Sequence, residues 1–252
     1  EGRTRSMLNI QSISKTFNPG TVNAKQALSG LSLHLDHGDF VTIIGSNGAG
    51  KSTLMNMITG YLAPTCGDIC VLGSNIRETP LAAKKDIGFL SEGSPLYPDM
   101  SVRSFLGYMA ELRGLGGKEK AARLREVCTA AKIENITAQR IETLSKGYQR
   151  RVGFAQSILS NPPILLLDEP TDGLDPNQKT HIRELITCMG KHKTILISTH
   201  LLEEAETIAT RIILISRGRI MADGTLTGIL KQTRSRTLEN AFKKLTTQSE
   251  EA

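Results

Sequence analysis

Cysteine is scarce in this sequence: the 252 residues include four, Cys66, Cys70, Cys128 and Cys188. Small disulfide-stabilised folds use more cysteines at closer spacing, so a disulfide framework is excluded and a reducing compartment is expected. Cys66 and Cys70 form a C-x-x-x-C pair without a matching second pair. Because structural zinc sites use about four ligands, this pair does not favour a metal site.

Long hydrophobic runs are also missing. The longest, ILLL at 164–167 and IILI at 212–215, are far shorter than the ~20 residues that span a bilayer. Nothing resembles a secretory signal, and there is no internal repeat or low-complexity segment. The first six residues, EGRTRS, precede Met7 and are interpreted as a remnant of cloning. The sequence therefore predicts no membrane-spanning helix.

The excess of positive charge is mild, with 31 Lys and Arg against 25 Asp and Glu and a net charge of +6. This balance favours anionic partners such as a nucleotide, a nucleic acid or a lipid surface, and it does not choose among them or exclude an ordinary solvated surface. The length suits one large α/β domain or two small ones.

Short apolar runs alternate with helical patterns. Four runs have the continuous apolar character of strands buried on both faces: 40–44, 164–168, 194–198 and 211–215. Their alternation with helices predicts an α/β fold with a mainly parallel sheet. Residues from about 95 to 160 are helical in pattern, which predicts a helical subdomain inserted into this core. Leu238, Phe242 and Leu245 predict a short amphipathic helix in the tail.

The segment GSNGAGKS, from Gly45 to Ser52, lies between an apolar strand and a helical stretch that ends at Gly60. It matches G-x-x-x-x-G-K-[ST], the pattern of a phosphate-binding loop, in the required context. Its glycines let backbone N–H groups curl around phosphates, and the following helix adds the positive end of its dipole. Lys51 is expected to reach the β- and γ-phosphates and Ser52 to hold Mg²⁺.

The run ILLLDEP ends in two acids. Asp168 can hold the Mg²⁺ shell through water, and Glu169 can orient or deprotonate a water that attacks the γ-phosphate. Two acids that merely cap a strand are the alternative, and the phosphate loop in the same chain favours the functional interpretation.

The segment LSKGYQRRVGFAQSIL, 144–159, reads as a helix with a basic start. The residues alone leave open a nucleic-acid patch, a solvated helix end or a phosphate site. Ser145 is a good N-cap residue for this helix. For Arg150 and Arg151 the alternatives are salt bridges within the helical subdomain and plain solvent exposure.

Five motifs, GSNGAGKST, LSKGY, ILLLDEP, GLDP and STH, follow one another in the order and spacing of ABC-transporter ATP-binding subunits, and the chain resembles this family from Met7 to about Asp223. The resemblance implies an α/β P-loop ATPase core at 7–223, with a small N-terminal antiparallel β part and the helical subdomain at about 95–160 inserted. Residues 224–252 would form a short helical tail.

The resemblance also assigns roles. Phe17 falls where an aromatic ring stacks on adenine, His200 would contact the γ-phosphate, and Asp175 lies in the loop that touches an opposite subunit. The residues implied for ATP binding are Phe17, Gly45, Ser46, Asn47, Gly48, Ala49, Gly50, Lys51, Ser52, Thr53, Ser145, Lys146, Gly147 and Asp175. Those implied for catalysis are Glu169, His200 and Glu92, and those for Mg²⁺ are Ser52, Asp168 and Glu92.

The chain departs from the family pattern at two motifs. Glu92 stands where the family usually has Gln; a carboxylate is still a hard oxygen ligand, but it adds negative charge near the γ-phosphate, and the sign of its effect on the rate is open. Lys146 and Tyr148 are variants in the signature LSKGY, which keeps Ser145 and Gly147. Together with SEGSPLYPDM, this signature resembles the type 2 exporter subset that serves sodium, drug, polysaccharide or gliding-motility systems.

The implied function is an ATPase that powers a separate membrane permease. Two copies would pack head to tail, each signature closing over the ATP of the other copy. The permease would dock beside Glu92 and 95–108, which implies a peripheral location on the cytoplasmic face of the membrane. No nucleic acid is expected as a partner. A nucleic-acid-linked ABC ATPase and an ATPase for lipoprotein release are the alternatives, and the transported substrate is not readable from the chain.

Overall fold

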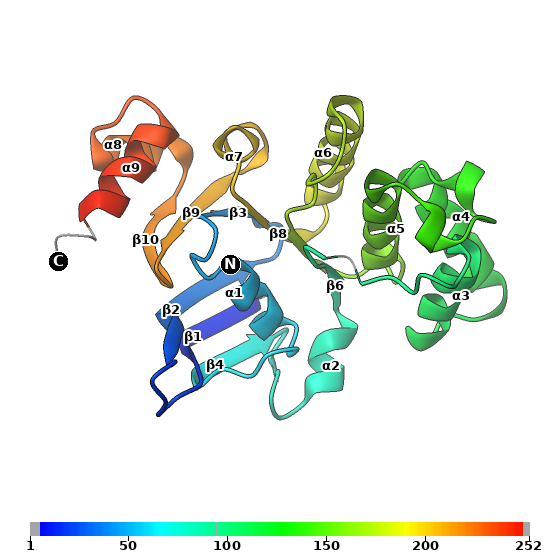
Figure 1. Cartoon of the computed structure of the whole chain (residues 1–252), viewed down its shortest axis with the longest axis horizontal. Helices are drawn as coiled ribbons and strands as arrows, with labels where there is room; N and C mark the ends of the chain where they lie inside the picture. The colour runs from blue at the N-terminus through cyan, green and yellow to red at the C-terminus, as the bar shows by residue number, and fades with distance from the viewer. Residues whose placement is uncertain (1–5, 94, 249–252) are drawn as a thin grey trace, which may run out of the picture. The chain divides into compact units, whose positions relative to one another are not determined.

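A computed structural model of the chain describes residues 6–93 and 95–248 (Figure 1). Most of the segment interpreted as a cloning remnant therefore lies outside the described residues. The chain forms two compact units. Unit 1 combines the chain up to Lys84 with the chain from Thr194 onward, and unit 2 is Lys85–Lys193.

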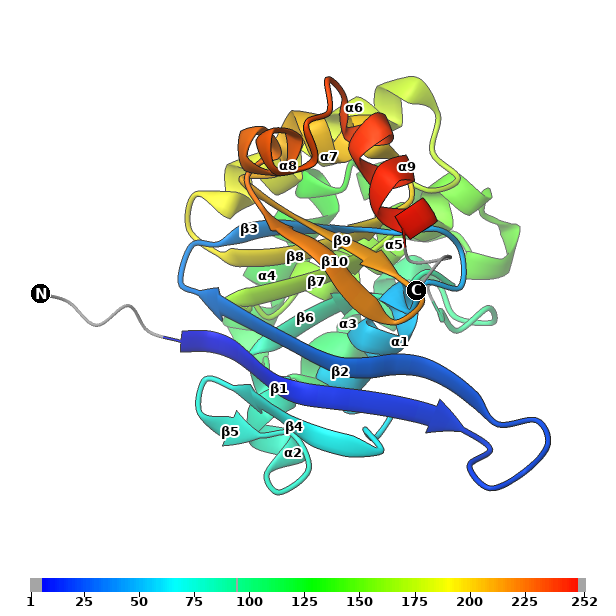
Figure 2. The same ribbon diagram turned by 90° about the vertical axis from the view of Figure 1, so that its left-hand side faces the viewer.

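Unit 1 contains an antiparallel sheet built on a long hairpin (Figure 2). On β2, Leu31, Leu33 and Leu35 are buried and alternate with exposed residues, the pattern of a sheet with one face on a core. The sheet has the order β2-β1-β4-β5, with β1 (Ser6–Phe17), β2 (Lys25–Asp36), β4 (Cys66–Val71) and β5 (Ser74–Asn75). This confirms the predicted N-terminal antiparallel part.

The second sheet of unit 1 surrounds β3 (Phe40–Ile44), whose five residues are all buried. β3 pairs in parallel with β8 (Thr194–Thr199) and with β9 (Arg211–Ser216), and β9 pairs in antiparallel fashion with β10 (Arg219–Gly224). Burial on both faces explains the continuous apolar character of these runs. The predicted strands at 40–44, 194–198 and 211–215 are confirmed.

The helices of unit 1 support these strands. They are α1 (Lys51–Ile58), α2 (Pro80–Lys85, which ends at the unit boundary), α7 (Leu202–Ile208), α8 (Leu226–Thr233) and α9 (Leu238–Gln248). Leu238 and Ala241 of α9 are buried in one cluster with Ile229 of α8 and Leu214 of β9, and Phe242 and Leu245 pack against it. The predicted amphipathic helix of the tail is confirmed.

Unit 2 contains a parallel pair of strands, β6 (Ile87–Leu90) and β7 (Ile164–Asp168), and a group of helices. Ser101 caps the first helix by accepting a hydrogen bond from the Ser104 amide at 3.1 Å. The helices are α3 (Val102–Leu112), α4 (Gly117–Ala130), α5 (Lys146–Ile158) and α6 (Pro176–Gly190), with 3₁₀ turns at Glu134–Ile136 and Ile141–Thr143. The helical region predicted at 95–160 lies within this unit.

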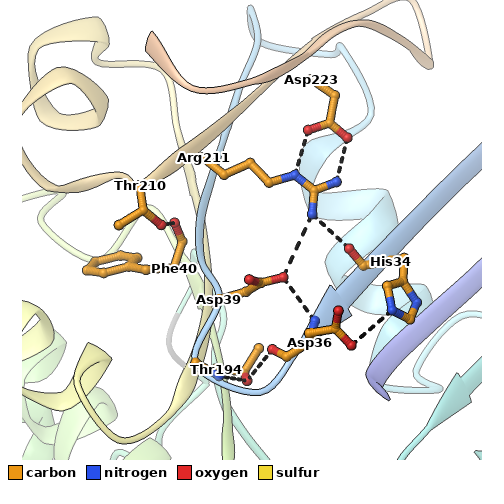
Figure 3. A network of polar contacts seen from close by, with 9 residues as sticks. His34, Asp36, Asp39, Phe40, Thr194, Thr210, Arg211 and Asp223 are labelled. Atoms are coloured by element: carbon orange, nitrogen blue, oxygen red, sulfur yellow. Dashed lines mark hydrogen bonds and ion pairs between the residues drawn. The ribbon is translucent and has the colours of Figure 1, made fainter. Parts of the chain in front are cut away.

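A polar network joins the amino ends of the strands in unit 1 (Figure 3). Arg211 donates to both carboxylate oxygens of Asp223 at 2.6 Å and to the His34 carbonyl at 2.9 Å. The Thr194 hydroxyl donates to the Asp36 carbonyl at 2.9 Å, and the Thr210 hydroxyl donates to that of Phe40 at 2.8 Å. Side chains thus tie the start of β9 and β8 to the ends of β2 and β10 and to the start of β3.

The cysteines and the lengths of the helices were both the subject of predictions from the sequence. The four cysteines are free thiols, with Cys66 and Cys70 both on β4. Among residues 6–93 and 95–248, no helix has both the length and the apolar character needed to cross a membrane.

Candidate functional site

The phosphate loop follows the carboxyl end of β3. Gly50, the N-cap of α1, has φ +110°, a conformation that L side chains rarely adopt. A Cβ at this position would lie 2.7 Å from Leu28 Cδ2 and 2.8 Å from the Ala27 carbonyl oxygen. Gly50 has no side chain that could cap α1, and main-chain amides are the donors that a helix start offers. Such a helix start favours anions.

Lys51 is buried and folded back on the loop. Its ammonium donates to the carbonyl oxygens of Gly45 at 2.8 Å and Ser46 at 3.3 Å. A buried ammonium held by main-chain carbonyls keeps a positive charge within the phosphate loop. Ser52 and Thr53 follow in the first turn of α1.

The β9–β10 turn forms a hydrogen bond with the phosphate loop. Gly218 donates its amide to the Ala49 carbonyl at 2.9 Å, and its own carbonyl accepts from the Ser29 amide at 3.0 Å. A Cβ on Gly218 would lie 2.4 Å from the Ala27 carbonyl oxygen, so glycine is required at this close approach. The role of Gly218 cannot be predicted from a local motif, because its partners Ala49 and Ser29 are more than 150 residues away in the sequence.

Phe17 and His200 are the two other predicted site residues of unit 1. Phe17 is 38% exposed at the end of β1 and pairs with Lys25, near Leu28, which contacts the loop. The hairpin thus carries this ring at the end that adjoins the phosphate loop, and Lys15 Nζ lies 5.4 Å from the ring centroid. His200 follows the carboxyl end of β8 and is exposed.

Unit 2 places its predicted carboxylates at the carboxyl ends of β6 and β7. Asp168 ends β7 and is buried; Glu169 follows it, 8% exposed, in the left-handed region at φ +51°. Glu92 follows β6 by two residues and is exposed. Because β6 and β7 pair in parallel with Leu90 opposite Leu167, the chain segments with Glu92 and Glu169 leave the same edge.

Arg150 and Arg151 are both buried, so the solvent-exposed alternative predicted for them is wrong. Arg150 donates to four main-chain carbonyls: Ser91 (2.6 Å), Glu92 (2.9 Å), Asp168 and Glu169 (2.5 Å). Burial lowers the pKa of its guanidinium, and the nearby carboxylates, Asp168 first, act in the opposite direction. Arg151 donates to the Lys132 carbonyl at 3.0 Å and lies 4.1 Å from the centroid of the Tyr148 ring.

The signature forms the start of α5. The Ser145 hydroxyl accepts from the Tyr148 amide at 3.4 Å, which confirms Ser145 as the N-cap, while Lys146 is exposed and Gly147 is buried. A Cβ on Gly147 would lie 2.8 Å from Gln178 Oε1. The start of α5 therefore lies against the start of α6.

Asp175 caps that neighbouring helix, α6. Its carboxylate accepts from the Gln178 amide at 2.9 Å. Unit 2 thus brings the signature and the Asp175 loop together. It also brings together the segments that carry Glu92 and Glu169.

The described residues contain no group of three or more His, Cys, Asp or Glu that could hold a metal ion on its own. The donors predicted for Mg²⁺ are the Ser52 hydroxyl and the carboxylates of Asp168 and Glu92. Hard oxygen donors of this kind suit Mg²⁺, which usually takes one or two carboxylates together with phosphates and water. The donor chemistry fits Mg²⁺ bound with a nucleotide.

Comparison with known proteins identifies the class. The ABC transporter family model matches residues 28–172. The ABC transporter ATP-binding protein NatA of Bacillus subtilis is 34% identical over 219 residues, which is 86% of this chain and 89% of that protein. Nod factor export ATP-binding protein I of Burkholderia thailandensis is 36% identical over 202 residues, 79% of this chain and 66% of that protein. This chain belongs to the ABC transporter family.

Solved structures agree. An ATP-binding subunit of an ABC transporter superposes with a TM-score of 0.86 at 28% identity, covering 95% of this chain and 99% of that one. The dimeric cassette MJ0796, in a post-hydrolysis state bound to ADP and Pi, gives 0.81 at 28% identity, covering 87% and 99%. The predicted family, fold class and ATPase class are confirmed.

The chain covers only part of some relatives. It spans 66% of the Burkholderia protein and 24% of ABC transporter A family member 1 of Dictyostelium discoideum, which is 32% identical over 85% of this chain. The assigned roles of individual residues stay predictions.

Proposed function

We propose that this chain is the ATP-hydrolysing subunit of an exporter and powers a separate membrane permease. The observation that carries the proposal is the phosphate loop after β3, with the buried Lys51 and a helix start that no side chain caps. The name of one relative, Nod factor export ATP-binding protein I, supports export as the direction of transport.

ATP binding is assigned mainly to main-chain donors. The amides of the loop and of the first turn of α1 hold the phosphates, and Lys51 exchanges its two loop carbonyls for the β- and γ-phosphate oxygens. Phe17 offers a partly exposed π face for the adenine. Ser52, Asp168 and Glu92 would hold Mg²⁺, which supplies positive charge at the phosphates.

Hydrolysis is assigned to groups that follow the strands. Glu169 orients the attacking water and accepts its proton, and His200 contacts the γ-phosphate. In-line attack on the γ-phosphorus depends on positioning and charge stabilisation more than on covalent chemistry. The buried setting of Glu169 supports this role, because a carboxylate held in one place needs little reorganisation during the reaction.

A second copy of the chain completes the site. Ser145, Lys146 and Gly147 at the start of α5 would contact ATP bound to the other copy, and the Asp175 loop beside them would contact that copy. The dimeric state of MJ0796 supports this arrangement. ATP then stabilises the closed dimer through contacts that hydrolysis removes, which is a population shift driven by a ligand.

The permease would dock on the surface at 95–108. Tyr97 and Tyr108 are 49% and 40% exposed, and their ring centroids lie 6.0 Å apart. Phe105 packs edge-on against Tyr97 at 5.7 Å. Exposed clustered aromatics favour a protein partner, and docking there would hold the chain on the cytoplasmic face of the membrane.

The test is the Glu169→Gln variant. We expect it to bind ATP while its turnover falls about 10²- to 10⁴-fold, the range for loss of a general base. Size-exclusion chromatography with ATP and Mg²⁺ should show a stable dimer of this variant, and Lys51→Ala should neither bind ATP nor dimerise. The matched control is Glu184→Gln, which changes an exposed carboxylate of α6, with wild-type turnover expected. Near wild-type hydrolysis by Glu169→Gln would remove Glu169 as the base.

A further inference from the structure

Arg150 is the one arginine of the described α5 helix whose hydrogen bonds reach the segments after both β6 and β7. Arg150 is 5% exposed, and each terminal nitrogen of its guanidinium donates to one of the two segments. Nη1 donates to the carbonyls of Ser91 and Glu92, and Nη2 donates to those of Asp168 and Glu169. All four acceptors are main-chain carbonyl oxygens. The fork of the guanidinium therefore fixes the spacing between two chain segments.

Burial of this charge needs a reason beyond packing. A guanidinium loses hydration on burial, and this cost is offset only if its donors find good acceptors. Hydrogen bonds with a charged donor are stronger than those between neutral groups, so four carbonyl acceptors constrain the two segments strongly. Arg suits this task better than Lys, because its planar fork can serve two acceptors on each side.

The hydrogen bonds of Arg150 hold the chain at Glu169, whose backbone conformation is uncommon. Glu169 adopts φ +51°, a left-handed conformation that is unfavourable for an L residue. Its carbonyl accepts from Arg150 and also from the Asp172 amide at 3.1 Å. The left-handed conformation that aims the Glu169 side chain is therefore held by hydrogen bonds to its own carbonyl.

We infer that Arg150 is a positioning residue for ATP hydrolysis. By holding the main chains of Glu169 and Glu92, it places their side chains for the attack by water. This inference rests on the proposed function. It also places the signature helix in the hydrolytic machinery of its own subunit, because Arg150 stands on α5, which begins at the signature. A shift of that helix would shift the carbonyl oxygens of both segments together.

The test compares two arginines of unit 2 that donate to main-chain carbonyls, Arg150 on α5 and Arg123 on α4. Arg150→Met keeps an unbranched apolar stem and removes the guanidinium donors. The matched control is Arg123→Met, because Arg123 on α4 donates to the carbonyls of Ile158 (2.8 Å) and Leu159 (3.0 Å) at the far end of α5. Both variants should lower the melting temperature, whereas only Arg150→Met should affect turnover.

We expect Arg150→Met to lower kcat about a hundredfold, the loss typical of a misplacement near 1 Å. The KM for ATP should change by less than about threefold, since the interaction lost is one that serves the transition state. In a Glu169→Gln background the same substitution should have little further effect, because residues that act as a unit are not additive. Should Arg150→Met fail to fold, Arg150→Gln, which keeps a two-donor amide, should fold and show an intermediate kcat.

Hydrogen exchange gives a reading that does not need activity. The Asp172 amide, bonded to the Glu169 carbonyl, should exchange faster in the Arg150 variant than in Arg123→Met. A folded Arg150 variant with kcat within threefold of wild type would overturn the inference, as would a full hundredfold loss on top of Glu169→Gln. Absence of ATPase activity in the wild-type protein would instead overturn the proposed function, and the exchange measurement would still decide whether Arg150 holds the segment.

Discussion

The substitution Gly50→Ala tests whether the main chain of the phosphate loop is what binds ATP. Gly50 stands at φ +110° between the loop and α1. An alanine Cβ there would meet Leu28 Cδ2 at 2.7 Å and the Ala27 carbonyl oxygen at 2.8 Å. The side chain of Leu28 can turn away, but the main chain of Ala27 belongs to β2 and is held in the sheet.

Two costs determine how much Gly50→Ala weakens ATP binding: the strained backbone conformation and the close contacts of the added Cβ. A non-glycine residue in a sparsely populated backbone region costs of order 1–3 kcal/mol. We take about 2 kcal/mol for the loss of the binding-competent loop, which corresponds to about a thirtyfold weaker Kd for ATP. The fold should survive, because total stabilities are about 5–15 kcal/mol.

The assay is calorimetric titration of ATP with Mg²⁺, and the control is Gly38→Ala. Gly38 has φ +85°, yet nothing lies within 4 Å of a Cβ added there. It should therefore lose some stability and keep its affinity for ATP. Wild-type affinity in a folded Gly50→Ala variant would refute the reasoning that the loop geometry determines nucleotide binding.

Two further predictions concern Glu92 and the Arg211 network. Glu92→Gln removes a negative charge from a proposed Mg²⁺ ligand and should shift the Mg²⁺ dependence of ATPase activity; an unaltered Mg²⁺ titration would count against a place for Glu92 near the metal. Arg211→Met should lower the free energy of unfolding by about 2 kcal/mol in urea titrations, because it leaves Asp223 without its bidentate partner, while Arg219→Met should stay within about 0.5 kcal/mol. Equal losses in the two variants would remove the special role of Arg211.

The strands of the parallel sheets could be predicted because burial on both faces leaves a local record. The runs at 40–44 and 164–168 coincide with β3 and β7, and those at 194–198 and 211–215 are each one residue short of β8 and β9. The phosphate loop could also be predicted, because the residues that identify it lie within eight consecutive positions. β6 was not predicted, since IGFL gives only four residues of pattern.

The parts of the site that were missed depend on contacts between distant positions. Gly218 is bound to Ala49 and Ser29, and nothing in its own neighbourhood, SRGRI, marks it as a support of the phosphate loop. Arg150 sits in a basic helix start that suggested solvent or salt bridges. Its acceptors are main-chain carbonyls, which have no residue type and therefore leave no trace in the sequence.

Arg150 and Arg211 hold main chain at different ends of parallel strands, and we therefore expect different effects when each is lost. Both donate to main-chain carbonyls in their own units, but Arg211 lies at the amino end of β9, where the neighbouring elements are β2, β3 and β10. Ligands of open α/β sheets bind outside the carboxyl ends of the strands. Arg150 holds the chain just after the carboxyl ends of β6 and β7, so its loss should reduce turnover, whereas loss of Arg211 should reduce stability alone.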